Sequence, residues 1–255
     1  MGAGHASRLY VSTDSPVHRL PPQTKLAALL AFVLIVVSTP RGAYWAFAAY
    51  GLMLLGVALT ARVPVPLVLR RMTVEIPFVL FALLIPFVAQ GPQTTVLGFS
   101  VSVSGLQAMV AILAKSTLGI FASVLLASTT EMRGILQGLE RLRLPPLMVQ
   151  IMGFMVRYMD VIGGERDRMR IARESRGFVA RDVRQMRIVA ASAGALFIRS
   201  YERGERVHLA MLSRGYTGTL PQVAVAEASP GQWATAAMLP LGALVVVLAA
   251  WMGTR

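Results

Sequence analysis

One short pattern of residue types occurs twice in this chain, and it contains side chains well suited to recognising a partner. Residues 172–178 read Ala-Arg-Glu-Ser-Arg-Gly-Phe, and residues 210–216 read Ala-Met-Leu-Ser-Arg-Gly-Tyr. A guanidinium is a rigid fork of donors that can bind carboxylates or carbonyls in a geometry that lysine cannot copy. The residues of interest are Ser175, Arg176, Gly177, Ser213, Arg214 and Gly215.

Each copy has the signals of a helix C-terminus. Arginine falls in the last turn, where a cation is stabilised by the helix dipole, and glycine takes the left-handed position that ends the helix. Two ordinary glycine-stopped helices with solvated arginines would give the same signals. The recurrence of small residue, serine, arginine, glycine and aromatic in one register instead favours a paired function, with one guanidinium at each of two helix tips.

A methionine stripe precedes the first copy. Met148, Met152, Met155 and Met159 recur at steps of four, three and four, which places them on one helix face. Methionine is flexible and suits a surface that packs against more than one partner. A core or lipid-facing stripe is the alternative interpretation.

Two long helices must carry these residues. Pro145 and Pro146 open one helix that ends near Arg176, and a second runs from about 181 to 214. The small apolar segment 189–198 in the second helix predicts a close approach of the two helices.

Composition defines the class of protein. The chain has 255 residues, of which 55% are hydrophobic and 15% charged, and its net charge is +13. These values indicate an integral membrane protein. The positive charge lies beside hydrophobic runs, where it orients a membrane protein, so no nucleic-acid binding is expected. Cysteine is absent and the three histidines are scattered, so we expect no disulfide, metal site or cofactor.

The apolar runs predict about five transmembrane helices, at 26–39, 43–61, 74–89, 106–128 and 233–251. Residues 40–42 form a turn, and the uncharged segment 90–105 fits an outside loop. Pro77 and Pro86 should give the third span kinks or broken geometry that neighbouring helices support. Sixteen arginines against nine acids place residues 131–214 on the cytoplasmic side. The prediction is therefore an all-α integral membrane protein with a pair of long cytoplasmic helices before the last span. Its regions are a cytoplasmic lead-in (1–25), a four-helix membrane region (26–128), the long-helix region (129–220), and a linker with the last span (221–255).

Lys115 lies within the fourth predicted span. A lysine near the centre of a bilayer costs roughly 2.5–3.5 kcal/mol, so it must snorkel, pair or face the protein interior. Pairing with carbonyls or another helix is the favoured interpretation, and a place on a substrate path is the alternative.

The chain resembles the transmembrane (T) component of energy-coupling-factor importers, most closely the cobalt-type CbiQ family. An N-terminal signature and two further motif regions carry the resemblance. The residues are Ser15, Pro16, His18, Leu20, Pro22, Lys25, Leu26; Leu144, Pro145, Arg157, Tyr158, Glu165, Arg168, Met169 and 172–177; and Arg199, Ser200, Glu202, Arg203, Arg206, Val207 and 210–216. Serine stands before the arginine where the family usually has alanine, and Pro21-Pro22-Gln23 replaces an acidic-proline-basic pattern.

The resemblance implies a non-catalytic subunit in the plasma membrane. It would hold two ATP-binding-cassette ATPases through the arginines of two coupling helices, with residues 1–25 and 129–230 cytoplasmic. It would also carry a separate substrate-binding membrane (S) subunit, for which the methionine stripe is the candidate contact. Cobalt, or nickel, would be the substrate. The chain has no Gly-x-x-x-x-Gly-Lys-Ser/Thr loop, so ATP hydrolysis would belong to the partners.

Two other classes of function remain open from the residues alone. A self-contained permease would explain Lys115 and the proline-broken third span. A membrane-embedded transferase would need paired carboxylates. The nearest sets, Glu165 with Asp167 and Glu202 with Glu205, are interleaved with arginines in a pattern typical of solvated helix pairing.

Overall fold

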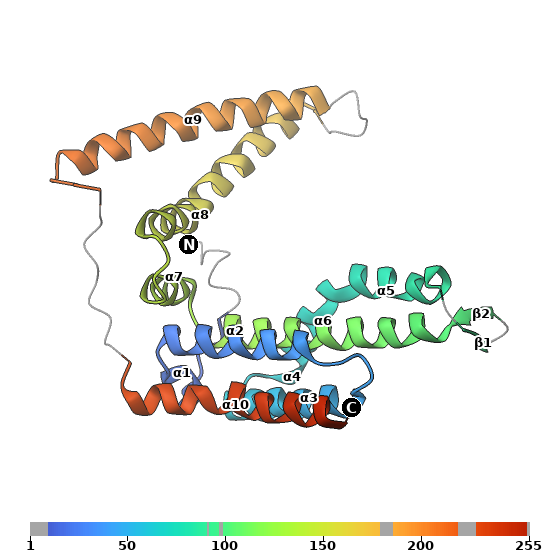
Figure 1. The fold of residues 1–255 in the computed structure, drawn as a ribbon. Helices are drawn as coiled ribbons and strands as arrows, with labels where there is room; N and C mark the ends of the chain where they lie inside the picture. Colours follow the sequence, from blue (N-terminus) through green and yellow to red (C-terminus); the bar gives the residue numbers. More distant parts are fainter. Residues whose placement is uncertain (1–9, 91, 97–98, 179–185, 219–227, 254–255) are drawn as a thin grey trace. The chain divides into compact units, whose positions relative to one another are not determined.

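The computed structural model describes residues 10–90, 92–96, 99–178, 186–218 and 228–253 (Figure 1). The chain divides into two compact units, which are described separately. The bundle comprises residues 9–142 and 226–255, and the helix pair belongs to the unit formed by residues 1–8 and 143–225.

The bundle is built from helices that begin, in most cases, beside a proline. Proline is favoured in the first helical turn because its missing N–H would have no partner there. The elements are α1 (Pro16–Arg19), α2 (Pro22–Ser38), α3 (Tyr44–Thr60), α4 (Val65–Arg71), a 3₁₀ turn (Met72–Glu75), α5 (Ile76–Val88), β1 (Gln93–Val96), β2 (Phe99–Ser102), α6 (Val103–Thr129), α7 (Met132–Arg141) and α10 (Pro230–Gly253).

The predicted class of fold is confirmed. Among the described residues, four helical stretches are long and apolar enough to cross a membrane: Pro66–Val88, Val103–Thr129, Pro146–Glu174 and Pro230–Gly253. Two further apolar helices, α2 and α3, are shorter. The stretch Pro146–Glu174 meets the criterion by length and composition, so its predicted cytoplasmic location stays a prediction.

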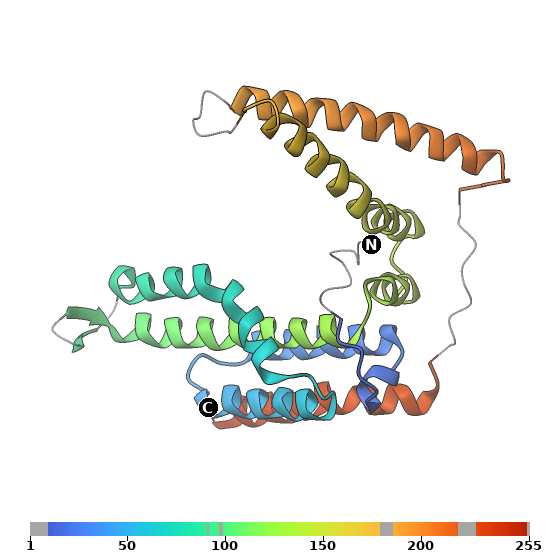
Figure 2. The same cartoon turned by 180° about the vertical axis from the view of Figure 1, so that it is seen from behind.

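The core of the bundle lies between α2, α3, α6 and α10. Phe32 and Tyr50 are fully buried and meet edge to face with ring centroids 5.9 Å apart. The Tyr50 hydroxyl lies 3.1 Å from Thr39 Oγ1 and donates to the Ala243 carbonyl at 3.5 Å. Figure 2 shows α3 beside α10, the arrangement that these contacts hold together.

The helical stretch that contains the third predicted span changes to a 3₁₀ turn just before Pro77, and it continues through Pro86. Pro77 stands in the first turn of α5 and Pro86 lies inside it, and the 3₁₀ turn separates α5 from α4. Glu75 ends the 3₁₀ turn and is only 7% exposed. Its Oε1 accepts hydrogen bonds from the hydroxyls of Ser116 and Thr117 on α6. These hydrogen bonds hold the 3₁₀ turn against α6.

Lys115 pairs with carbonyls, as the favoured interpretation predicted. Its Nζ donates to the Val37 carbonyl at 2.7 Å and to the Thr39 carbonyl at 2.8 Å. These carbonyls end α2, where no further helical N–H groups are available to bond them. The lysine therefore caps a neighbouring helix.

The loop at 90–105 contains a short antiparallel hairpin that the sequence analysis did not anticipate. Gln93 lies opposite Ser102 and Val96 opposite Phe99. Threonine, valine and phenylalanine favour strands, which explains the pairing in a segment without charges. Ser102 then begins α6, with its hydroxyl accepting from the Gly105 N–H at 3.4 Å.

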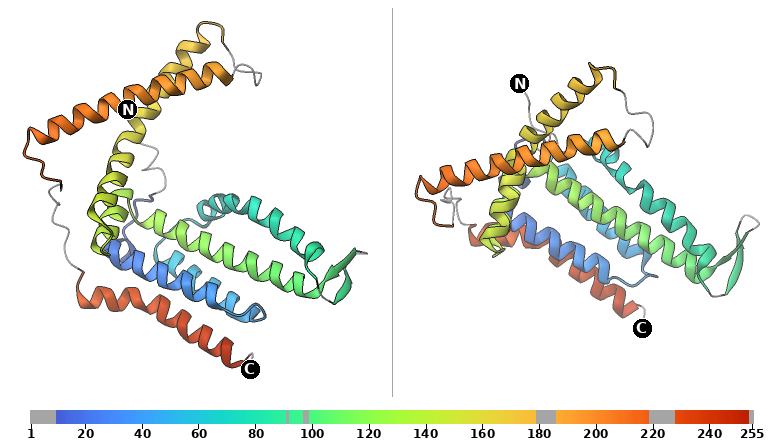
Figure 3. Two further views of the ribbon diagram at one scale, coloured as in Figure 1. Left: turned by 45° about the horizontal axis from the view of Figure 1, so that its top comes forward. Right: turned by 90° about the horizontal axis from the view of Figure 1, so that it is seen from above.

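The helix pair consists of α8 (Pro146–Glu174) and α9 (Met186–Leu212), which run antiparallel and cross (Figure 3). Within the small apolar segment 189–198, Gly194 makes no close contact, because a Cβ there would meet nothing within 4 Å. Ser192 in the same segment does contact the facing helix, since its Oγ accepts a hydrogen bond of 3.2 Å from Arg173 Nη1. Residues 181–185, which were predicted to be helical, lie outside the described residues.

Candidate functional site

The first repeated segment ends α8 in a closed turn. The Phe178 N–H donates to the Arg173 carbonyl at 3.1 Å, and the Gly177 N–H donates to the Glu174 carbonyl at 3.0 Å. Gly177 has φ +75°, the left-handed conformation that this arrangement needs. The sequence signals for a glycine-stopped helix were correct, and Arg176 is fixed at the end of the turn.

The second segment repeats this hydrogen-bond pattern. The Tyr216 N–H donates to the Met211 carbonyl at 3.1 Å, and the Gly215 N–H donates to the Leu212 carbonyl at 3.0 Å. Gly215 has φ +79°. The two copies therefore share a backbone conformation as well as a sequence, and Arg214 takes the same position as the arginine of the first copy.

The two serines bond to their own helices. Ser175 Oγ donates to the Ile171 carbonyl at 2.8 Å, and Ser213 Oγ donates to the Ala210 carbonyl at 3.0 Å. The hydroxyl proton is thus satisfied locally at both positions. This explains in physical terms how serine can replace alanine before the arginine without changing the turn.

Both tip guanidiniums are exposed. Neither Arg176 nor Arg214 makes a side-chain hydrogen bond or ion pair with any described residue. Arg173 contacts Ser192, and 21 residues of helix and turn separate Ser192 from Ser213. At 1.5 Å per residue the two tips lie about 30–40 Å apart, too far to share one carboxylate. Each guanidinium is available to a separate partner.

The second tip folds back on the start of α8. Gln150 Nε2 donates to the Tyr216 hydroxyl at 2.6 Å, and the Tyr216 ring meets His208 edge to face at 6.4 Å. The aromatic residue after the glycine therefore fixes the tip against both long helices.

Glu165 joins the middle of α8 to α9. Its side chain is only 14% exposed and forms ion pairs with Arg203 at 3.0 Å and Arg199 at 3.4 Å. From the sequence, Glu165 was predicted to belong to a solvated pattern of charges, so this link between the helices was not predicted. Its membership of the family motif, together with that of Arg199 and Arg203, was the signal that could have revealed it.

The methionine stripe lies on α8, as predicted. Met148, Met155 and Met159 are 50%, 60% and 53% exposed, and Met152 is partly buried. On α9, Phe197 and Tyr201 are also exposed, at 72% and 68%. The helix pair thus presents large apolar side chains that no described residue covers. This arrangement is typical of a surface for a partner or a lipid interface.

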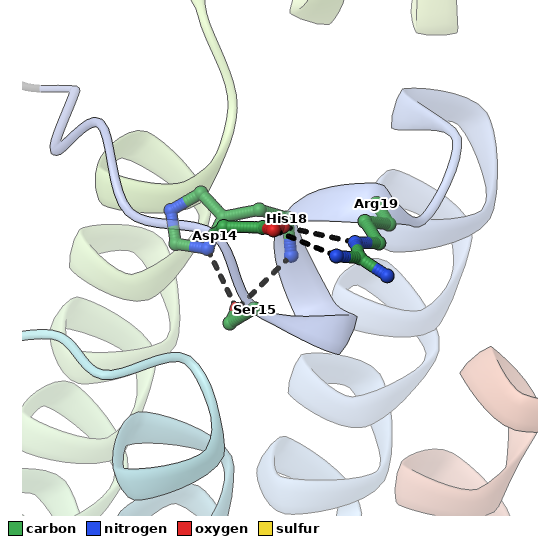
Figure 4. A network of polar contacts seen from close by, with 4 residues as sticks. All are labelled: Asp14, Ser15, His18 and Arg19. Carbon is green, nitrogen blue, oxygen red and sulfur yellow. Dashed lines mark hydrogen bonds and ion pairs between the residues drawn. The ribbon is translucent and has the colours of Figure 1, made fainter.

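The N-terminal signature forms a separate polar junction in the bundle (Figure 4). Ser15 begins α1, and its hydroxyl lies 2.7 Å from His18 Nδ1. Arg19 donates from Nε and Nη2 to Asp14 at 2.9 and 2.6 Å, which lowers the pKa of that exposed carboxyl below its ordinary value. Lys25 is 8% exposed and donates to the Thr129 carbonyl at 2.8 Å, so the junction also caps the end of α6.

No group of three or more histidine, aspartate or glutamate side chains suited to a metal ion occurs in the described part of the chain. The candidate site comprises two exposed cationic tips, exposed apolar side chains on the helix pair, and an ion-paired link between the helices.

Comparison with known proteins assigns the family. The profile of the CbiQ family, described as a cobalt transport protein, matches residues 13–225. The energy-coupling factor transporter transmembrane protein EcfT of Bacillus subtilis is 30% identical over 223 residues, which cover 82% of this chain and 83% of that protein. EcfT of Thermanaerovibrio acidaminovorans is 28% identical over 94% of this chain and 92% of its own length. A putative fused cobalt transport protein, CbiMQ, of Methanocorpusculum labreanum is 24% identical over 82% of this chain and 36% of its own length.

The bundle, the paired long helices and these relatives define a multi-pass transmembrane component of an energy-coupling-factor transporter. The chain belongs to the CbiQ family.

Proposed function

We propose that this chain is the coupling subunit of an importer, and that Arg176 and Arg214 each bind one of two ATP-binding-cassette ATPase subunits. The single observation that carries the proposal is the identical turn at the two tips, each ending in an exposed arginine. The turn already fixes the backbone of each arginine, so binding a carboxylate or carbonyl has to order only the side chain. A separation of about 30–40 Å assigns one tip to each ATPase.

Glu165 supports the transmission of motion between the tips. Because it binds α9 at Arg199 and Arg203, a displacement of one tip changes the crossing of both helices. ATP-driven closure of the two ATPases would then move the helix pair as one body. The helices would transmit this movement to whatever partner lies on their apolar face.

We assign that apolar face to a separate substrate-binding membrane subunit. The exposed methionines can repack as the helices change their crossing, because the side chain has three rotatable bonds. The substrate is cobalt, or nickel, in keeping with the description of the family, and the S subunit binds it. The present chain lies in the plasma membrane with its helix pair in the cytoplasm. ATP is hydrolysed by the ATPase subunits.

The hydrogen bonds of Lys115 weaken the case for a self-contained permease. The ammonium group already has two carbonyl acceptors at the end of α2. A structural role therefore accounts for the residue that most favoured a substrate path.

The test is co-purification of the ATPases with tip variants from the native host. We expect Arg176→Ala and Arg214→Ala each to reduce ATPase recovery, and the double variant to abolish both recovery and ATP-driven metal uptake. Loss of a charge-assisted contact typically costs about 2–5 kcal/mol, which a pull-down detects.

Arg166→Ala serves as the matched control, because Arg166 is exposed on α8 and lies ten residues before Arg176. This variant should leave recovery unchanged. Normal ATPase recovery with the double tip variant would refute docking through the tips. A second measurement, identification of the small membrane protein that co-purifies and its bound ion, tests the assignment of substrate and S subunit.

A further inference from the structure

The bundle contains a cavity of about 900 Å³ between α1, α2, α3, α6 and α10. This volume lies within the range of about 300–1,000 Å³ that is typical of ligand sites. Its lining residues all belong to the bundle, and none of them is a residue of the helix pair.

Polar and apolar residues are segregated along the cavity. The polar lining residues lie in the short helix α1 or within two turns of the end of a longer helix, and these helix ends are all on the same side of the bundle. They are Arg19, Lys25, Thr60, Thr129, Gln232 and Thr235. The remaining lining residues are apolar or glycine.

The apolar part extends to a similar depth on each of the four long helices. From each polar position the lining continues seven residues along the helix, from Lys25 to Phe32, from Thr60 to Met53, from Thr129 to Ala122 and from Gln232 to Leu239. At 1.5 Å per residue this is about 10 Å. A cavity with a polar mouth and an apolar interior of this depth matches the boundary between lipid headgroups and acyl chains, where apolar faces are buried about 5–10 Å.

The electrostatics of the mouth favour an anion. Lys25 forms no ion pair with a described carboxylate, and its acceptors are the neutral oxygens of His18, Thr129 and Thr130. The N-terminus of α10, whose dipole is positive, lies at the same mouth with Gln232. Arg19 uses Nε and Nη2 on Asp14, which leaves Nη1 without a hydrogen bond to any described residue.

We propose that this cavity binds one anionic phospholipid, with an acyl chain in the apolar interior and the phosphate at the mouth beside Lys25, Arg19 and the start of α10. The chemistry that selects it is the combination of an apolar cavity with a polar mouth and a buried ammonium that has no carboxylate partner among the described residues. The proposal is independent of the coupling role of the helix pair.

The glycines provide a matched pair of variants. Gly56 lines the cavity, and a Cβ at Gly56 would meet nothing within 4 Å, so we expect the side chain of Gly56→Leu to occupy the cavity. A Cβ at Gly119 on α6 would also meet nothing within 4 Å, and Gly119 does not line the cavity. Both changes replace glycine in a helix with a better helix former, so neither should impair folding.

The experiment is native mass spectrometry of the purified full chain with phosphatidylglycerol or phosphatidylcholine added at equal concentrations. We expect one retained phosphatidylglycerol, held about tenfold more tightly than phosphatidylcholine, since a charge-assisted contact is worth about one decade in affinity. Gly56→Leu should lose this lipid, and Gly119→Leu should keep it.

Two exposed variants test the headgroup contact in opposite directions. Arg19→Gln should reduce the preference for phosphatidylglycerol, whereas Asp14→Asn should increase it by releasing the guanidinium. Equal lipid retention by Gly56→Leu and Gly119→Leu would overturn the assignment of the cavity. Equal retention of the two lipids by the unmodified chain would overturn the anionic headgroup, and no retention of either lipid would overturn the lipid site as a whole.

Discussion

Glu165 on α8 and Arg203 on α9 form an ion pair between the two long helices, with Oε2 and Nη2 3.0 Å apart. Arg199 approaches the other carboxylate oxygen at 3.4 Å. One carboxylate therefore holds two turns of the facing helix. Since the carboxylate is largely buried, its pairing contributes more than an exposed surface pair would.

Replacing Glu165 should loosen the helix pair. Glu165→Gln is expected to cost about 1–2 kcal/mol, a value reduced because Arg199 is 59% exposed. The chain has no cysteine, so spin labels can be placed on Ser175→Cys and Ser213→Cys without background. Electron paramagnetic resonance should give a tip separation of about 30–40 Å, with a broader distribution in the Glu165→Gln variant.

Asp167→Asn is the control for this measurement, because Asp167 pairs only with its exposed neighbour Arg166 among the described residues. It should leave the distance distribution unchanged. Identical distributions for Glu165→Gln and the unmodified chain would show that the ion pair does not hold the helices.

The tip glycines give a second prediction. A Cβ at Gly177 or Gly215 would meet no atom within 4 Å, so the cost of alanine there is the left-handed backbone alone. Gly177→Ala and Gly215→Ala should each destabilise the turn by about 1–2 kcal/mol. Their ATPase recovery should fall less than that of the arginine variants, because the guanidinium remains.

Gly194→Ala is the matched control, since Gly194 is helical with equally open surroundings. Alanine should stabilise that helix by up to about 1 kcal/mol. If all three alanine variants behaved alike in thermal unfolding and pull-down, the left-handed turn would have no role in the tip.

A change at Lys115 distinguishes a structural role of this lysine from a role in transport. Lys115→Met should lower the stability of the bundle by about 1–3 kcal/mol, because the Val37 and Thr39 carbonyls lose their donor. Measured per folded complex, metal uptake should stay near normal. A variant with unchanged thermal stability but no uptake would restore the substrate-path interpretation.

The sequence predicted those features that depend on local composition. Apolar run length located the membrane helices to within a few residues, and the arginine-glycine-aromatic order predicted both tips, because helix ends are determined by neighbouring residues. Contacts between residues far apart in the sequence could not be predicted from local composition. The partners of Lys115 and Glu165 depend on how helices pack, which no local pattern encodes.

The small residues also show that local sequence does not determine which helices pack closely. The segment around Gly194 has the composition of a close helix contact, yet Gly194 has open surroundings. Close contacts in the bundle occur at other glycines, among them Gly105 on α6 and the Gly-x-x-x-Gly pair Gly134 and Gly138 on α7, none of which was singled out from the sequence. Composition permits a close approach, and the packing of the fold decides which small residues are used.

The contact of α7 with α2 yields the last prediction. A Cβ at Gly138 would lie 2.6 Å from Leu26 Cδ1 and 3.0 Å from the Pro22 carbonyl carbon, whereas at Gly134 the nearest atom is Pro22 Cγ at 3.2 Å. The Pro22 backbone cannot move aside as a side chain can, so Gly138→Ala should cost about 1–3 kcal/mol. Gly134→Ala should cost less, because a proline ring and a threonine methyl group can shift. Thermal unfolding of the two variants in detergent measures the difference. Equal stability would mean that α7 can move along α2, and the close contact at Gly138 would then have no part in holding α7 on the bundle.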